Sequence, residues 1–494
     1  MKYDTKRVKN NKLLVLMIIH IILFVFVSFI LTNLDLQGNS LLFTYFISII
    51  VFIWCFLTAY IFEKKLGSPY VMYLIMYFIC LFGQLTLRVV FHYDNPRILE
   101  MIDYYSSSII IKATILSLYC LMGMHLGVLV YYLFGFSRNF AQKRNNVYDN
   151  DIYNILRYMG WLLVIISIKS SLSLFYNNFI LASIRGYIGV YSNVRYGLES
   201  VDEKIAQYFF IGLITLMIAY KEQISISKTI FIFGMIFYGL QIFWGARGFL
   251  LLQVITLIWV WHNFIKPISK RVFLFGIILF YPISSILVLI RLVREFPLTE
   301  WVSNISFFFI EAVKENPILS IITELGTAIG PTAAAICLIP YILPYGKGIS
   351  YLYSIFMIVP NFNVNSPNQA MLKANVPMII SDIVGVRFGG SIIEEAFYNF
   401  GWLSWMFFIG IGFLIAFFSS YIYKIKNPFV SVLLYSFIPN LLWTVRNAYY
   451  PIPREILYNI IFPLIAYYII KKFYQDKLSY RYNIKVQKKV KTCQ

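Results

Sequence analysis

Long apolar segments, separated by short charged stretches, dominate the chain. Each is close to the 17–25 residues that an α-helix needs to cross about 30 Å of hydrocarbon. Flanking charges, prolines and glycines mark out twelve such segments, at 13–31, 41–62, 70–90, 114–134, 158–175, 206–220, 229–244, 249–264, 272–290, 402–423, 429–445 and 456–470. The pattern predicts an all-α membrane protein with about twelve transmembrane helices.

The distribution of charge along this pattern predicts which way the chain crosses. With the N-terminus in the cytoplasm, the inner segments hold 26 Lys and Arg against 6 acids, and the outer segments hold 16 of each. Cytoplasmic loops of membrane proteins carry such an excess of positive charge, so both termini are predicted to be cytoplasmic. The first apolar segment lacks a small-residue cleavage site and is interpreted as a retained helix.

Loop lengths divide the chain into four regions. Residues 1–290 hold the first nine predicted helices, and residues 402–470 hold the last three. Between helices nine and ten, residues 291–401 form a large outer loop with room for a functional layer. Residues 471–494 form a basic cytoplasmic tail, which is expected to contact anionic membrane lipid.

Part of the large loop is itself apolar. Residues 318–343 are interrupted by polar, glycine and proline positions, namely Glu324, Gly326, Gly330, Pro331 and Pro340. This stretch is predicted to lie in the interface or to re-enter the membrane. The alternative is an additional pair of crossings together with residues 349–359.

Composition excludes several classes of protein. The chain is 60% hydrophobic and only 13% charged, whereas soluble chains are about 25% charged, so a soluble enzyme is excluded. Its net charge of +20 would suggest nucleic acid in a soluble protein. Here the predicted cytoplasmic face accounts for that charge, and no nucleic-acid partner is expected.

Missing motifs exclude further chemistry. The chain has no phosphate loop of the form G-x-x-x-x-G-K-[ST] and no H-E-x-x-H, and its five cysteines and four histidines are scattered. No metal or other cofactor is expected. Asp149-Asn-Asp151 lies in an inner loop that is too short for a nucleotide-binding domain, and Gly123-Met-His125-Leu-Gly127 indicates close helix packing around a buried histidine.

Arginines on the predicted outer side are the first candidate for chemistry. They lie near helix ends, at Arg247, Arg291, Arg294, Arg387 and Arg446, with Arg88 deeper and Arg454 nearby. A planar guanidinium matches the oxygens of a diphosphate, and the first five are predicted to bind one. The alternatives for each are contact with lipid phosphate or an ion pair with a nearby acid.

A second candidate site follows Arg387. Gly389 and Gly390 allow a tight turn, and Ser391 with Glu394 predicts a helix-capping box. Glu395 then lies on a different helix face from Glu394, one turn before Tyr398 and Asn399. Glu395 is predicted to orient or deprotonate a sugar hydroxyl, with Tyr398 and Asn399 binding sugar. His92 is a second candidate base.

Two of these segments resemble a known family. Gly389-Gly-Ser391 followed by Glu395-Ala-Phe-Tyr-Asn-Phe-Gly401 resembles the G-x-S turn and E-A-[YF]-x-N-F-G stretch of O-antigen polysaccharide polymerases of the Wzy type. Gly245-Ala-Arg247-Gly248 is similar to the family's arginine turn between two helices. Glu394 departs from the small or apolar residue that the family pattern has there, so either glutamate could be the important one.

The resemblance implies a glycosyltransferase of the bacterial inner membrane with a GT-C-like architecture. It implies a role in lipopolysaccharide biosynthesis, in which oligosaccharide repeat units carried on undecaprenyl diphosphate are joined at the outer face. The diphosphate activates the donor, so the reaction needs neither metal nor nucleotide. A chain-length regulator is an expected type of partner.

Other functions remain open at this stage. A flippase for lipid-linked oligosaccharide also crosses the membrane many times, but such proteins have short outer loops. An O-antigen ligase uses the same donor but usually relies on a histidine in its large outer loop, and residues 291–401 contain none. A structural or sensory membrane protein is a further alternative.

Overall fold

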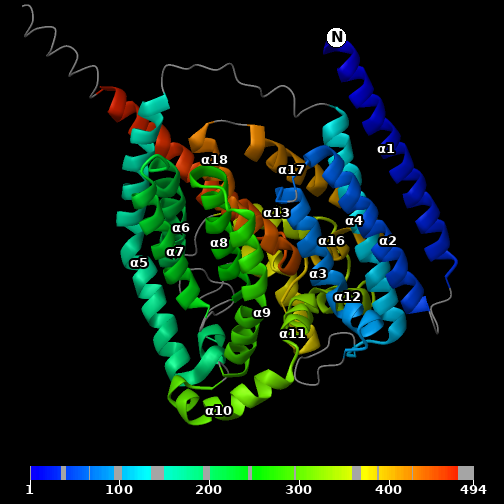
Figure 1. Ribbon diagram of the computed structural model, residues 1–494. Helices are drawn as coiled ribbons and strands as arrows, with labels where there is room; N and C mark the ends of the chain where they lie inside the picture. Colours follow the sequence, from blue (N-terminus) through cyan, green and yellow to red (C-terminus); the bar gives the residue numbers. More distant parts are fainter. Residues whose placement is uncertain are drawn as a thin grey trace, which may run out of the picture.

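The computed structural model describes residues 2–34, 40–65, 67–93, 103–134, 149–192, 201–242, 247–293, 296–358, 369–386, 389–424 and 427–476. All regular secondary structure in these ranges is helical (Figure 1). The longer helices are α1 (Lys2–Thr32), α2 (Ser40–Glu63), α3 (Pro69–Val90), α4 (Ser107–Leu133), α5 (Asp149–Ser192), α6 (Val201–Ala219), α7 (Ile224–Gln241), α8 (Arg247–Val260), α9 (Lys270–Val293), α10 (Leu298–Lys314), α17 (Ser404–Lys424) and α18 (Pro428–Trp443). The shorter helices are α11 (Pro317–Leu325), α12 (Ile329–Leu338), α13 (Ile349–Phe356), α14 (Gln369–Ala374), α15 (Val376–Val384), α16 (Ile392–Phe400) and α19 (Ile452–Ile456). The all-α prediction is confirmed.

Twelve helical segments of the described chain are long and apolar enough to cross a membrane, as predicted. They are Asn11–Thr32, Ser40–Glu63, Pro69–Val90, Ser107–Leu133, Asp151–Gly186, Ile224–Gln241, Gly248–Ile265, Lys270–Val293, Pro317–Leu338, Ile392–Ile422, Pro428–Arg446 and Ile452–Asp476. Eleven of them overlap the predicted segments. The predicted segment 206–220 falls in α6, which is less apolar because Asp202, Glu203 and Lys204 lie in its first turn. Pro317–Leu338, from the large loop, is the twelfth.

The two ends of the described chain lie at the same end of the bundle. In Figure 1, α1 begins at the upper end, and the helical segment that ends at Asp476 rises to that end as well. Helix α10 runs across the opposite, lower end (Figure 1). An even number of crossings requires this arrangement of the ends.

The apolar part of the large loop forms a bent helical segment. Helices α11 and α12 join at Gly326, where a Cβ atom would lie 2.7 Å from the backbone nitrogen of Gln84 in α3. The next helix, α13, has 8 residues and is therefore about 12 Å long, too short to cross about 30 Å of hydrocarbon. Helix α13 therefore does not by itself form the second crossing of the alternative.

Helix α4 is the central helix and packs directly on α17. The backbones approach so closely that a Cβ atom on Gly123 or Gly127 would collide with a carbonyl group of α17, and one on Gly412 would collide with a carbonyl group of α4. His125, between the two glycines of α4, has no exposed surface. The predicted close packing around a buried histidine is confirmed.

Candidate functional site around Glu395

Three segments that are distant in sequence meet where α16 begins. A Cβ atom on Gly389 would lie 3.6 Å from the carbonyl oxygen of Arg446, and one on Gly390 would lie 3.5 Å from the backbone nitrogen of Ala448. The glycine turn therefore packs against the segment after α18. Gly248, in the first turn of α8, contacts the ring of Trp443, and the Arg446 guanidinium lies 5.9 Å from the centre of that ring. The motif of α8 and the motif of α16 therefore both pack against the segment 443–448, which carries Arg446.

Ser391 and Glu394 form the predicted capping box. The Ser391 hydroxyl accepts hydrogen bonds from the backbone N–H groups of Ile393 and Glu394, at 3.1 and 3.2 Å. Glu394 Oε2 accepts in return from the Ser391 N–H at 3.1 Å. These bonds satisfy the unpaired donors of the first helical turn, as a capping box does.

Glu395 is fully buried and accepts three hydrogen bonds from two other segments. Its Oε1 accepts from the Ser350 hydroxyl at 3.0 Å, and its Oε2 accepts from the backbone N–H groups of Tyr449 and Tyr450 at 2.6 and 3.1 Å. The carboxylate thus joins α16 to the start of α13 and to the turn before α19. In the described residues its hydrogen-bond donors are a hydroxyl and two amides, with no basic side chain among them.

Asn399 holds the same α13 segment one helical turn later. Its amide nitrogen donates to the Ser350 hydroxyl at 2.7 Å, and its amide oxygen accepts from the Gly348 N–H at 3.0 Å. The Tyr398 carbonyl accepts from the Gly346 N–H at 2.8 Å. Both predicted sugar-binding residues therefore position residues 346–350 beside Glu395. Their contact with sugar stays a prediction.

Aromatic rings pack beside this carboxylate. Tyr351 stacks on Phe407 with ring centres 4.6 Å apart and meets Tyr449 edge-on at 5.2 Å. Burial raises the pKa of both tyrosines above the ordinary value, and the nearby charge of Glu395 raises it further. Their phenols are neutral at physiological pH.

Sequence reasoning missed Ser350, Tyr449 and Tyr450 as partners of Glu395. Tyr449 and Tyr450 contribute backbone N–H groups, which every residue except proline carries, so their side chains give no signal. Ser350 was within the large loop, but nothing in the sequence indicated which of its hydroxyls would reach Glu395.

Arg291 lies in a separate, buried network. Its guanidinium donates two hydrogen bonds to the Glu315 carboxylate, at 2.9 and 2.7 Å, and a third to the Ser320 hydroxyl at 2.7 Å. This is the ion pair with a nearby acid that the sequence left open as the alternative. The predicted contact of Arg291 with a diphosphate stays a prediction.

The structure describes only some of the remaining predicted site residues. Arg294 and Arg387 lie outside the described residues, and Arg247 begins α8 without a described side chain. His92 is exposed, and no hydrogen bond between it and Glu395 is found among the described residues. Arg88 pairs with Asp103 at 2.6 Å, half exposed.

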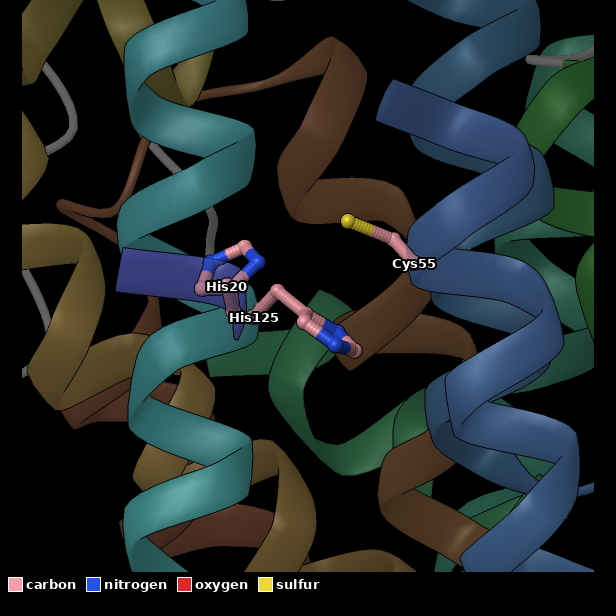
Figure 2. A group of neighbouring side chains, drawn as sticks. All are labelled: His20, Cys55 and His125. Carbon is pink, nitrogen blue, oxygen red and sulfur yellow. The ribbon is translucent and has the colours of Figure 1, made fainter. Parts of the chain in front are cut away.

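One group in the described part of the chain has the side chains to hold a metal ion. Figure 2 shows His20 of α1, Cys55 of α2 and His125 of α4 approaching one another, and their ligand atoms lie within 4.8 Å. However, both nitrogens of His20 already have partners. Nδ1 accepts from the indole N–H of Trp54 at 3.2 Å, and Nε2 lies 2.9 Å from the carbonyl oxygen of Met122, to which it donates.

The ring of His125 is equally occupied. The Thr58 hydroxyl donates to the Trp54 carbonyl at 2.7 Å, so it accepts from the His125 Nε2–H at 2.9 Å. Nδ1 then accepts from the Tyr70 hydroxyl at 2.6 Å. A metal ion would have to displace two of these four hydrogen bonds. The network instead explains how α1, which is mostly exposed, is fixed to α2 and α4.

One of three comparisons with known proteins agrees with the resemblance noted in the sequence. The comparisons with curated proteins and with solved structures each gave no match. A model of the O-antigen polysaccharide polymerase Wzy family matches residues 14–477, which is nearly the whole chain. The chain therefore belongs to the O-antigen polysaccharide polymerase Wzy family.

Proposed function

We propose that this protein joins oligosaccharide repeat units carried on undecaprenyl diphosphate, at the outer face of the bacterial inner membrane. The family match supports a polymerase role, and the twelve apolar segments support a multi-pass membrane location. The site itself is proposed to lie at the start of α16, between Glu395 and Arg446.

The observation that carries this proposal is the convergence of the two family-like motifs on Arg446. The α16 glycine turn packs on the backbone of Arg446. The first turn of α8 packs on Trp443, and the Arg446 guanidinium lies over the Trp443 ring. Arg247 begins that turn of α8. Glu395 accepts hydrogen bonds from the Tyr449 and Tyr450 N–H groups, in the same segment as Arg446, so a carboxylate and an arginine are carried on connected segments, as transfer from a diphosphate would use them.

In the proposed reaction, a hydroxyl oxygen of the acceptor sugar attacks the anomeric carbon of the donor. The bond from that carbon to the diphosphate oxygen breaks, and undecaprenyl diphosphate leaves with the electron pair. Arg446 and Arg247 stabilise the negative charge that develops on this leaving group. The hydroxyl proton passes to a base, for which Glu395 is the first candidate.

The geometry favours one edge of the Glu395 carboxylate for this role. Oε2 already accepts two backbone hydrogen bonds, whereas Oε1 accepts one, from Ser350. Each carboxylate oxygen has two lone pairs, so Oε1 retains one for an acceptor hydroxyl. Residues 346–350, which Tyr398 and Asn399 hold, lie on this edge and are the proposed route to the sugar.

The decisive experiment is polymerisation in vitro. Purified protein is incubated with a synthetic undecaprenyl-diphosphate repeat unit without ATP, and the products are separated on a gel. A ladder of products that differ by one repeat unit supports the proposal. Unchanged substrate, together with transport of that substrate across proteoliposomes, would instead support a flippase.

A further inference from the structure

A polar pocket lies at the end of the bundle where the chain begins, away from Glu395. Here α5 begins, α6 ends and α7 begins (Figure 1). The pocket has a volume of about 220 Å³ and is lined by Tyr153, Asn154, Arg157, Ala219, Lys221 and Glu222. We call it the α5–α6 pocket. One water molecule needs about 10–15 Å³ on this measure, so the pocket has room for a tetrahedral anion with some of its hydration.

Close packing of two helices creates this pocket. A Cβ atom on Gly160 of α5 would lie 2.7 Å from the Leu216 side chain, and one on Gly212 of α6 would lie 2.8 Å from the Val164 side chain. This close approach brings Arg157, one turn before Gly160, against Tyr220 at the end of α6. The Arg157 guanidinium lies 4.9 Å from the centre of the Tyr220 ring.

Aromatic rings and an amide hold both cations of the pocket in place. The Lys221 ammonium lies 4.4 Å from the centre of the Tyr153 ring, and Arg157 donates to the Asn154 amide oxygen at 3.1 Å. Cation–π contacts of this kind stabilise a charge without neutralising it. Both side chains are therefore positioned while keeping their full positive charge.

No carboxylate of the described residues forms an ion pair with either cation. Glu222, on the pocket rim, is exposed, and the nearby Asp151 carboxylate accepts from the Tyr474 hydroxyl at 3.3 Å. Arg157 Nε is buried and has no hydrogen-bond acceptor in the described structure. The lining holds two cations and one exposed carboxylate, Glu222, so it keeps a net positive charge that attracts an anion. The buried Arg157 N–H without an acceptor adds a donor for that anion.

We propose that the α5–α6 pocket binds a phosphate group. Guanidinium and ammonium groups together with an amide are the donors that recognise phosphate oxygens. The pocket lies at an end of the membrane-spanning bundle, so the phosphate could come from the headgroup of an anionic lipid or from free phosphate. This site is independent of the polymerase reaction proposed above and does not rest on it.

Direct binding measurements test the proposal on the full-length protein in a zwitterionic detergent. Radiolabelled inorganic phosphate is measured by equilibrium dialysis. Dihexanoyl phosphatidylglycerol and dihexanoyl phosphatidylcholine are each titrated while tryptophan fluorescence is recorded, because the Trp161 indole donates to the Tyr220 hydroxyl at the pocket edge. We expect one saturable site per chain for phosphate, for phosphatidylglycerol or for both, and none for phosphatidylcholine.

Variants decide whether the signal comes from this pocket. Arg157→Gln and Lys221→Gln should each weaken binding by about tenfold or more, because each removes one charge-assisted contact. Lys228→Gln, an exposed lysine of α7 at the same end, is the control and should bind normally. Lys221 lies in the turn between α6 and α7, so its replacement is compatible with folding even if Arg157→Gln is not.

Each outcome has a defined meaning. Binding of phosphatidylglycerol alone identifies a lipid headgroup site, binding of inorganic phosphate alone identifies a free-phosphate site, and competition between the two shows that either source can occupy it. The proposal is overturned if neither ligand binds saturably. It is also overturned if Lys221→Gln binds like the parent protein, or if Lys228→Gln loses as much affinity as the pocket variants.

Discussion

Glu395 accepts a hydrogen bond of 2.6 Å from the backbone N–H of Tyr449, which lies 54 positions later in the chain. This bond connects the first turn of α16 to the segment that carries Arg446. Together with the hydrogen bond from the Tyr450 N–H, it attaches the Glu395 carboxylate to that segment. Substitutions on either side of it give the clearest tests of the proposed site.

Glu395→Gln should abolish polymer formation while leaving single repeat units. An amide cannot act as a base, and loss of general-base catalysis typically lowers rates by about 10²–10⁴-fold. The gel ladder measures this effect, and the thermal unfolding midpoint in detergent shows whether the variant is folded. Ser350→Ala, which removes one hydrogen bond from Oε1, should leave much more activity. A normal ladder from Glu395→Gln would show that Glu395 is not a catalytic residue.

Arg446→Lys should be nearly as damaging to polymerisation as Arg446→Ala. Lysine keeps the charge but loses the planar fork that binds two phosphate oxygens at once. The initial rate of ladder formation is the measurement. Arg271→Lys, at the exposed start of α9, is the matched control and should behave like the parent protein. Full activity in Arg446→Lys would show that Arg446 contributes only a positive charge or packing, and no bidentate contact with phosphate.

Arg291→Leu should destabilise the fold strongly, because it removes the Arg291 guanidinium and its two hydrogen bonds from the buried Glu315 carboxylate. Removing one partner of a buried ion pair typically costs about 3–5 kcal/mol, whereas replacing both partners by apolar residues costs far less. The double variant Arg291→Leu/Glu315→Leu should thus recover much of the lost thermal stability. If the folded double variant also polymerises normally, Arg291 has a structural role. If it is folded but inactive, the predicted contact with diphosphate is supported.

Gly127→Ala should destabilise the contact between α4 and α17. The added Cβ atom would collide with the Ile409 carbonyl, and overpacking of this kind costs about 1–3 kcal/mol. The thermal unfolding midpoint should fall, and the yield of folded protein should fall with it. Gly410→Ala is the control, because a Cβ atom there has no neighbour within 4 Å. Equal stability of the two variants would contradict the close approach of the helices.

The sequence predicted those features that depend on local pattern. Eleven membrane segments follow from runs of apolar residues, and the capping box follows from Ser391 and Glu394 standing three positions apart. The sequence could not predict contacts that fold distant segments together. Glu315 lies 24 positions after Arg291, and three other acids, Glu295, Glu300 and Glu311, are nearer to Arg291 in the sequence.

The α6 segment shows a different limit. Its length and apolar character predict a membrane helix, but Lys204 in its first turn is buried against Glu455, at 2.6 Å. A charge at the end of an apolar segment normally marks its boundary with water. Here a partner 251 positions away allows the charge to be buried, and only the tertiary structure provides that partner.

The complete burial of Glu395 has a consequence for the timing of the proposed reaction. Glu395 has no exposed surface, so a sugar hydroxyl can reach the unused lone pair of Oε1 only after the segment from Gly348 to Ser350 has moved. That glycine has a φ of +87°, a conformation that other residues adopt only with strain. Chain elongation would then be paced by this movement, and Gly348→Ala, which strains the closed segment, should change the rate of every addition of a repeat unit on the gel ladder by the same factor.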